Sequence, residues 1–93
     1  MAAEVAVTVP GLLRDSVGGR SQFTIRAETL AGALEQLQQA YPRLRVHVYD
    51  EAGQLRPHVL IFYNAESIAW LDRLDVPLKP GDQIQILQAV SGG

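Results

Sequence analysis

The chain has 93 residues, of which 47% are hydrophobic and 19% are charged, and its formal net charge at pH 7 is −2. This length fits one domain, and the balance of apolar and charged residues is that of a globular protein. The basic residues are scattered along a slightly acidic chain, which argues against a nucleic-acid partner. The absence of cysteine excludes disulfides, zinc–thiolate sites and a thiol nucleophile.

Two strands are predicted before residue 27. Residues 4–9 alternate valine with smaller or more polar residues, which is the period of a strand that has one face buried. Pro10 and Gly11 interrupt this pattern, and it resumes over residues 21–26 with Phe23 and Ile25 on the buried face. The two segments are therefore expected to form a β-hairpin with an elaborated loop.

A helix is predicted next. Thr29 occupies the N-cap position, and an apolar stripe follows at helical spacing, made of Leu30, Ala33, Leu34, Leu37 and Tyr41. Pro42 disfavours helical backbone in the residue before it, so this helix is expected to end near Tyr41. Residues 43–49 alternate like a strand but follow directly on a helix, and the pattern leaves both structures open.

Three more strands complete the predicted fold. Residues 59–63 are apolar at every position, which is typical of a central strand. A turn over residues 64–67 is expected to lead into a short strand at residues 68–70, and Pro80 and Gly81 introduce a last strand over residues 83–87.

This order of elements, β-β-α-β-β-β, is that of an α+β protein with the β-grasp (ubiquitin-like) fold. It predicts a mixed sheet of four or five strands with one main helix packed across one face. Residues 1–87 would form the β-grasp domain and residues 88–93 a flexible C-terminal tail. Neither a secretory leader nor ~20 consecutive apolar residues is present, so the sequence predicts a soluble, cytoplasmic protein without a membrane partner.

The tail is the predicted functional element, because its last residues, Gly92 and Gly93, have no side chain. Such a tail can thread a channel that would exclude any other residue. The reactive group would then be the terminal carboxylate of Gly93. It is ionised at neutral pH and a poor electrophile, so another protein must activate it.

Taken together in order, several short motifs resemble the sulfur carrier proteins of the MoaD/ThiS family. They are the run 9–14 after the first strand, Gly18-Gly19, Thr29-Leu30 at the start of the helix, residues 59–64, residues 79–82, and residues 89–93 at the tail. The run 9–14 followed by Gly18-Gly19 is most similar to carriers that deliver sulfide for cysteine biosynthesis.

The resemblance implies a mechanism. An adenylating, ubiquitin-activating-like enzyme would use ATP to activate Gly93, a sulfur donor would convert it to a thiocarboxylate, and a sulfur-accepting synthase would use that sulfur. Ala89, Val90, Ser91 and Gly92 would be the residues that partners recognise. The chain would be a carrier rather than an enzyme and would bind no cofactor itself. Three alternatives are a small subunit of molybdopterin synthase, a ubiquitin-like modifier joined to lysines, and a non-covalent β-grasp interaction domain.

A partner interface is predicted on the sheet face opposite the helix. If Val59 and Ile61 point to the core, Leu60 and Phe62 point outward, and the same alternation places Leu87 beside them. Exposed apolar clusters of this kind mark protein interaction surfaces. No metal site is expected, since His47 and His58 have no carboxylate at ligand spacing.

Overall fold

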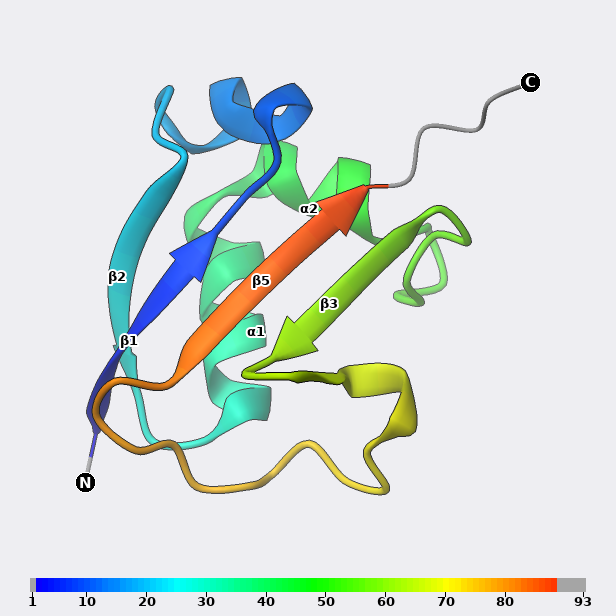
Figure 1. The fold of residues 1–93 in the computed structure, drawn as a ribbon. Coiled ribbons are helices and arrows are strands. Elements are labelled where there is room, and N and C mark those ends of the chain that lie inside the picture. The colour runs from blue at the N-terminus through cyan, green and yellow to red at the C-terminus, as the bar shows by residue number, and fades with distance from the viewer. Residues whose placement is uncertain (1, 89–93) are drawn as a thin grey trace.

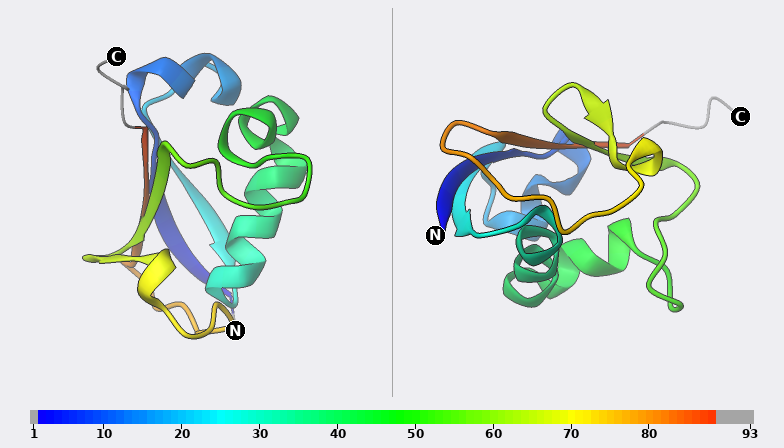
Figure 2. Two further views of the ribbon diagram at one scale, coloured as in Figure 1. Left: turned by 90° about the vertical axis from the view of Figure 1, so that its right-hand side faces the viewer. Right: turned by 90° about the horizontal axis from the view of Figure 1, so that it is seen from below.

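The computed structural model describes residues 2–88 and consists of a five-stranded sheet with helices on one face (Figures 1 and 2). The elements in chain order are β1 (Ala3–Thr8), η1 (Gly11–Val17, a 3₁₀ helix), β2 (Gln22–Ala27), α1 (Leu30–Ala40), α2 (Pro42–Val48), β3 (Val59–Tyr63), β4 (Glu66–Ser67), η2 (Ile68–Trp70, a 3₁₀ helix) and β5 (Gln83–Gln88).

The sheet is mixed, with strand order β2-β1-β5-β3-β4. The β1–β5 pair is parallel and the other three pairs are antiparallel. The alternating pattern of β1 is confirmed, because Val5 and Val7 are buried against the helices. Both residues belong to one continuous apolar core between sheet and helices, so the predicted β-grasp plan is the observed one.

Helix α1 follows its sequence signals closely. The Thr29 side chain accepts a hydrogen bond from the Gly32 backbone N–H at 3.0 Å, which satisfies one of the unpaired donors at the helix start. The predicted stripe faces the sheet: Leu30, Ala33, Leu34 and Leu37 are buried.

The segment that the sequence left open is a second helix, α2. Pro42 stands at its start, where the fixed φ of proline suits a helix and its missing N–H is not needed. Leu44 and Val48, four residues apart, are buried, whereas Val46 between them is 63% exposed. Burial at the spacing of a helix therefore decides the structure of a segment whose alternation is that of a strand.

Two expectations about the second half of the sheet were wrong. Residues 68–70 form η2 rather than a strand, because the Ser67 hydroxyl accepts a hydrogen bond from the Ala69 N–H and turns the chain into a 3₁₀ helix. The short strand is β4, within the predicted turn. The middle strand is β5 and not β3: the outer side of β3 is open to solvent, so its unbroken apolar run does not reflect burial on both faces.

A polar cluster links the end of β3 to the start of β5. The Asp82 carboxylate accepts hydrogen bonds from the Tyr63 hydroxyl at 2.5 Å, the Asn64 amide at 3.3 Å and the Lys79 backbone N–H at 2.8 Å. Burial alone would raise the pKa of Asp82, but these three hydrogen bonds outweigh it and lower the pKa. Burial, helped by the hydrogen bond to Asp82 and its charge, raises the pKa of Tyr63 to about 12.

These two shifts predict a loss of stability at both ends of the pH scale. A lowered carboxyl pKa stabilises the fold above the unfolded value of about 3.9, and this contribution is lost as the pH falls through the folded pKa. A raised tyrosine pKa stabilises the fold below about pH 10, and this contribution is lost as the pH rises toward 12. Urea unfolding followed by circular dichroism should show a smaller acid loss in Asp82→Asn and a smaller alkaline loss in Tyr63→Phe. Unchanged pH profiles in both variants would contradict this account.

Candidate functional site

The base of the predicted tail is held by the sheet. Strand β5 ends at Gln88, one residue into the segment assigned to the tail, and Gln88 pairs with Val59 at the start of β3. The residues predicted for recognition and chemistry, Ala89, Val90, Ser91, Gly92 and Gly93, lie outside the described residues. The sheet therefore sets the point from which they leave the domain.

The three residues predicted to form an interface lie on the outer face of the sheet. The antiparallel register places Leu60 directly opposite Leu87, and Phe62 follows two residues along the same face of β3. Leu60 is 44% exposed and Leu87 is 36% exposed, whereas Phe62 is half-buried. Two cross-strand neighbours and one diagonal neighbour thus form a continuous apolar surface beside the point where the chain leaves β5.

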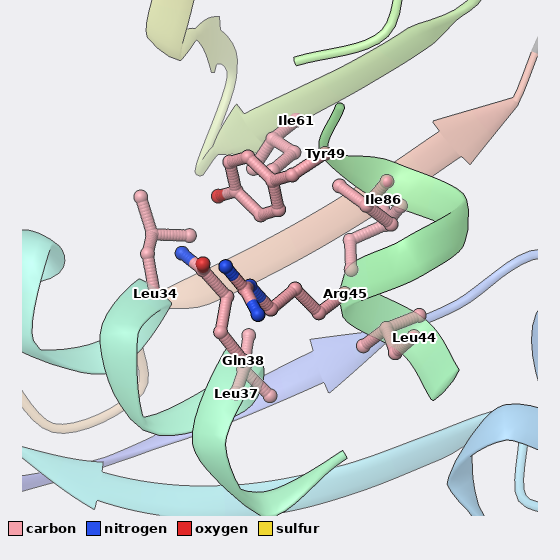
Figure 3. A pocket seen from close by; sticks show the side chains of 9 residues that line it. Leu34, Leu37, Gln38, Leu44, Arg45, Tyr49, Ile61 and Ile86 are labelled. Atoms are coloured by element: carbon pink, nitrogen blue, oxygen red, sulfur yellow. The ribbon is translucent and has the colours of Figure 1, made fainter. Parts of the chain in front are cut away.

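The opposite, helix-facing side of the same strands is closed. Leu34, Leu37 and Leu44 from the helices meet Ile61 and Ile86 from the sheet around a small cavity (Figure 3). Its volume is about 10 Å³, which leaves room for no more than one water molecule and hence for no ligand.

Three polar side chains, Gln38, Arg45 and Tyr49, also line this cavity (Figure 3). Burial raises the pKa of the Tyr49 hydroxyl, against a hydrogen bond with the Gln38 side chain that lowers it. Because the helix-facing side has room for no more than one water molecule, the outer face of the sheet is the candidate site.

One residue of this outer surface was missed by sequence reasoning, which placed Trp70 in a strand. Trp70 is 81% exposed and lines a groove with Leu60 and Phe62. In the 3₁₀ helix η2, Ile68 is buried and Trp70 points away from the core, although in a strand the two would share a face. The signal that could have revealed it is Ser67 before Ile68, a residue type that caps short turns.

Three arginines, Arg14, Arg56 and Arg73, form hydrogen bonds within the domain. The Arg14 guanidinium donates two hydrogen bonds to the Gly19 carbonyl at 3.3 and 3.2 Å, and Arg56 donates one to the Val46 carbonyl at 3.0 Å. Arg73 forms a two-pronged ion pair with Asp75 at 2.6 and 2.8 Å, and this hydrogen bonding lowers the pKa of the Asp75 carboxyl. Each arginine therefore stabilises a turn or a neighbouring residue.

The side chains of residues 2–88 offer no candidate metal site. Among them, no three His, Cys, Asp or Glu residues are grouped closely enough to hold a metal ion, and His47 and His58 are both exposed. Within the same range, every helix is too short or too polar to cross a membrane. The outer apolar surface and the end of β5 are the features that remain.

Comparison with known proteins identifies a family and relatives that match nearly the whole chain. The family model described as "ThiS family" matches residues 7–93. The sulfur carrier protein CysO of Mycobacterium tuberculosis is 30% identical over 91 residues, covering 96% of this chain and 98% of that protein.

Solved structures agree with the family match. The small archaeal modifier protein 1 (SAMP1) of Methanosarcina acetivorans superposes with a TM-score of 0.80 at 29% identity, covering 100% of this chain and 99% of that chain. A chain in the crystal structure of the Amycolatopsis orientalis BexX/CysO complex superposes with a TM-score of 0.78 at 25% identity, covering 96% of this chain and 99% of that chain. The sheet has the β-grasp order, the chain leaves the sheet at the end of β5, and the family model matches nearly the full length of the chain. The protein therefore belongs to the ThiS family of ubiquitin-like sulfur carriers.

Proposed function

We propose that this chain carries sulfur as a thiocarboxylate on Gly93 and donates it in the biosynthesis of cysteine or a similar small metabolite. The observation that carries the proposal is the 30% identity to the sulfur carrier CysO across 96% of the chain. The fold supports it, because the middle strand β5 runs directly into the segment that ends in Gly92 and Gly93.

The proposed chemistry begins with activation. The Gly93 carboxylate oxygen attacks the α-phosphorus of ATP on an adenylating enzyme, and pyrophosphate leaves. The resulting mixed anhydride has an electrophilic carbonyl carbon. Sulfide attacks that carbon, the new C–S bond forms, the C–O bond to AMP breaks, and one proton is released. The product is a C-terminal thiocarboxylate, whose sulfur is a nucleophile for the substrate of a sulfur-accepting synthase.

The length of the tail explains how the domain and the tail can have separate roles. Five residues beyond Gln88 span at most about 18 Å when fully extended, which is enough to enter an active site while the folded domain stays outside. Ordering such a tail costs conformational entropy, so contacts between the domain and the partner must offset that cost. Leu60, Phe62 and Leu87 are the residues that we assign to those contacts.

The test is an intact-mass measurement on the purified chain. Incubation with the adenylating enzyme of the same genome, ATP and sulfide should add the mass difference between sulfur and oxygen, and fragmentation should place it at Gly93. Reactions without ATP or without the enzyme serve as controls. An unchanged mass in the complete reaction, with an enzyme that activates another carrier of this family, would refute the proposal.

A second candidate function is conjugation to other proteins, and the similarity to SAMP1, which is named a modifier protein, favours it. In that case Gly93 would form isopeptide bonds to target lysines, and these bonds resist thiol reagents. The chain contains a single lysine, Lys79, so self-conjugates through a side chain could form only there. Thiol-resistant adducts in cell extracts would support conjugation, whereas a free thiocarboxylate as the end product would support sulfur donation.

A further inference from the structure

The most exposed large apolar side chain in residues 2–88 is Trp70, which is 81% exposed and is the only tryptophan of the chain. Its position is fixed by the short helix that carries it. Ile68 anchors η2 in the core, the Ser67 hydroxyl caps its first turn, and the Leu71 N–H donates to the Ile68 carbonyl at 3.1 Å. The backbone that carries the indole ring is therefore fixed in place. The ring nevertheless leaves a large apolar surface exposed to water, which is unfavourable.

Trp70 forms one wall of a groove on the outer side of the sheet. The groove is lined by Leu60, Phe62, Ala65, Glu66, Ser67 and Trp70. Strand β4 is the edge strand beside β3, and η2 follows it at the same edge of the sheet (Figures 1 and 2). Because Leu60 also pairs with Leu87, the groove continues the apolar surface that begins at the end of β5.

We propose that this groove binds a projection of the adenylating enzyme that carries an apolar side chain next to an arginine or lysine. The apolar part follows from the leucine, phenylalanine and tryptophan walls. The basic part follows from charge complementarity, because Glu66 is the one ionisable residue among the groove's lining residues. This inference rests on the proposed function in one respect: it takes its occupant, the adenylating enzyme, from that function.

The occupant is assigned to the adenylating enzyme because activation is common to both candidate functions, sulfur donation and conjugation. The groove runs along β3 from Leu60, next to the Val59–Gln88 pair, to Phe62, with Trp70 beside them. One partner can therefore contact the groove and the tail at the same time.

The single tryptophan allows a direct binding experiment. The chain is labelled with 5-fluorotryptophan, so that ¹⁹F NMR reports one carrier signal whatever tryptophans the unlabelled enzyme contains. Addition of the adenylating enzyme should shift and broaden this signal, because the indole leaves water for an apolar surface. The same change should occur with a chain that lacks Gly92 and Gly93, since the groove does not include the tail. An unchanged signal under conditions in which the enzyme adenylates the carrier would overturn the proposal.

Kinetics provides the second measurement. Trp70→Ala should raise the KM for the carrier in ATP–pyrophosphate exchange by at least about tenfold with kcat unchanged, as expected for a binding contact formed before the chemical step. Glu66→Lys should raise KM as well, whereas Glu66→Gln should have a smaller effect. The matched control is Val46→Ala, which truncates another exposed apolar residue, 63% exposed, on helix α2. A KM for Trp70→Ala within about twofold of wild type would refute the role of the groove.

These measurements separate failure of this inference from failure of the proposed function. Adenylation with no ¹⁹F change refutes the groove and leaves sulfur carriage intact. A ¹⁹F change with no adenylation supports the groove and refutes the proposed chemistry. If neither a ¹⁹F change nor adenylation is observed, both proposals are refuted. A signal that shifts when the labelled chain alone is concentrated would assign the groove to a second copy of this chain and would overturn the proposal.

Discussion

Deleting Gly92 and Gly93 is expected to abolish thiocarboxylate formation completely while leaving the domain folded. The loss should be complete because the new terminus, Ser91, carries a side chain and ends about 7 Å short of the original carboxylate. Near-attack chemistry requires reacting atoms about 3–3.5 Å apart, so such a shortfall cannot be tolerated. The domain should be unaffected because its core is built from residues before Gln88.

The measurement combines intact mass with thermal unfolding of the truncated and the full-length chain. A chain with one alanine added after Gly93 is the companion variant, because it keeps Gly92 and Gly93 but places a side chain at the terminus. Both variants should unfold at the wild-type temperature, and neither should acquire sulfur. Sulfur incorporation into the truncated chain would show that the reactive atom lies elsewhere.

Truncating Ile61 is expected to cost about 2–5 kcal/mol of the free energy of unfolding, whereas truncating its neighbour Leu60 is expected to cost less than about 1 kcal/mol. Ile61 is 1% exposed and packs among helix and sheet residues, so Ile61→Ala leaves a cavity. Leu60 is 44% exposed and loses mainly its contact with Leu87. A domain of this size has roughly 5–15 kcal/mol of stability in total, so the first loss is severe.

The effect of the two substitutions on the KM for the carrier should be the reverse of their effect on stability. Leu60→Ala should raise the KM for the carrier in the adenylation reaction, since it removes part of the outer apolar surface. Ile61→Ala should leave that KM unchanged at temperatures where the domain is still folded. Urea unfolding and pyrophosphate exchange on the same two preparations check both halves. Equal stability losses, or a KM change in Ile61→Ala alone, would contradict the assignment of the two faces of β3.

Much of the fold could be predicted from sequence because its signals are local. The valine alternation of β1 and the Thr29 cap with its apolar stripe each depend on neighbours within a few residues, and the structure confirms both. The apolar register of β3 was also predicted, since Val59 and Ile61 are buried and Leu60 is exposed. Alternation along a strand determines which side chains share a face wherever that strand lies in the sheet.

What sequence reasoning could not decide depends on contacts between distant segments. Residues 43–49 alternate like a strand, yet burial of Leu44 and Val48 against the core makes them a helix. Trp70 was placed in a strand because its local pattern does not show how η2 turns away from the sheet.

By itself the sequence determined the opening β-hairpin, the buried stripe of helix α1, and the glycine-ended segment whose resemblance indicated a sulfur carrier. Only the tertiary structure decided which strand lies in the middle of the sheet and that Leu60 stands opposite Leu87 with Trp70 beside their common surface. The physical reason is that periodicity is set by the geometry of one segment. Strand order and a shared surface are set by the packing energy of segments far apart in the chain, which no local pattern records.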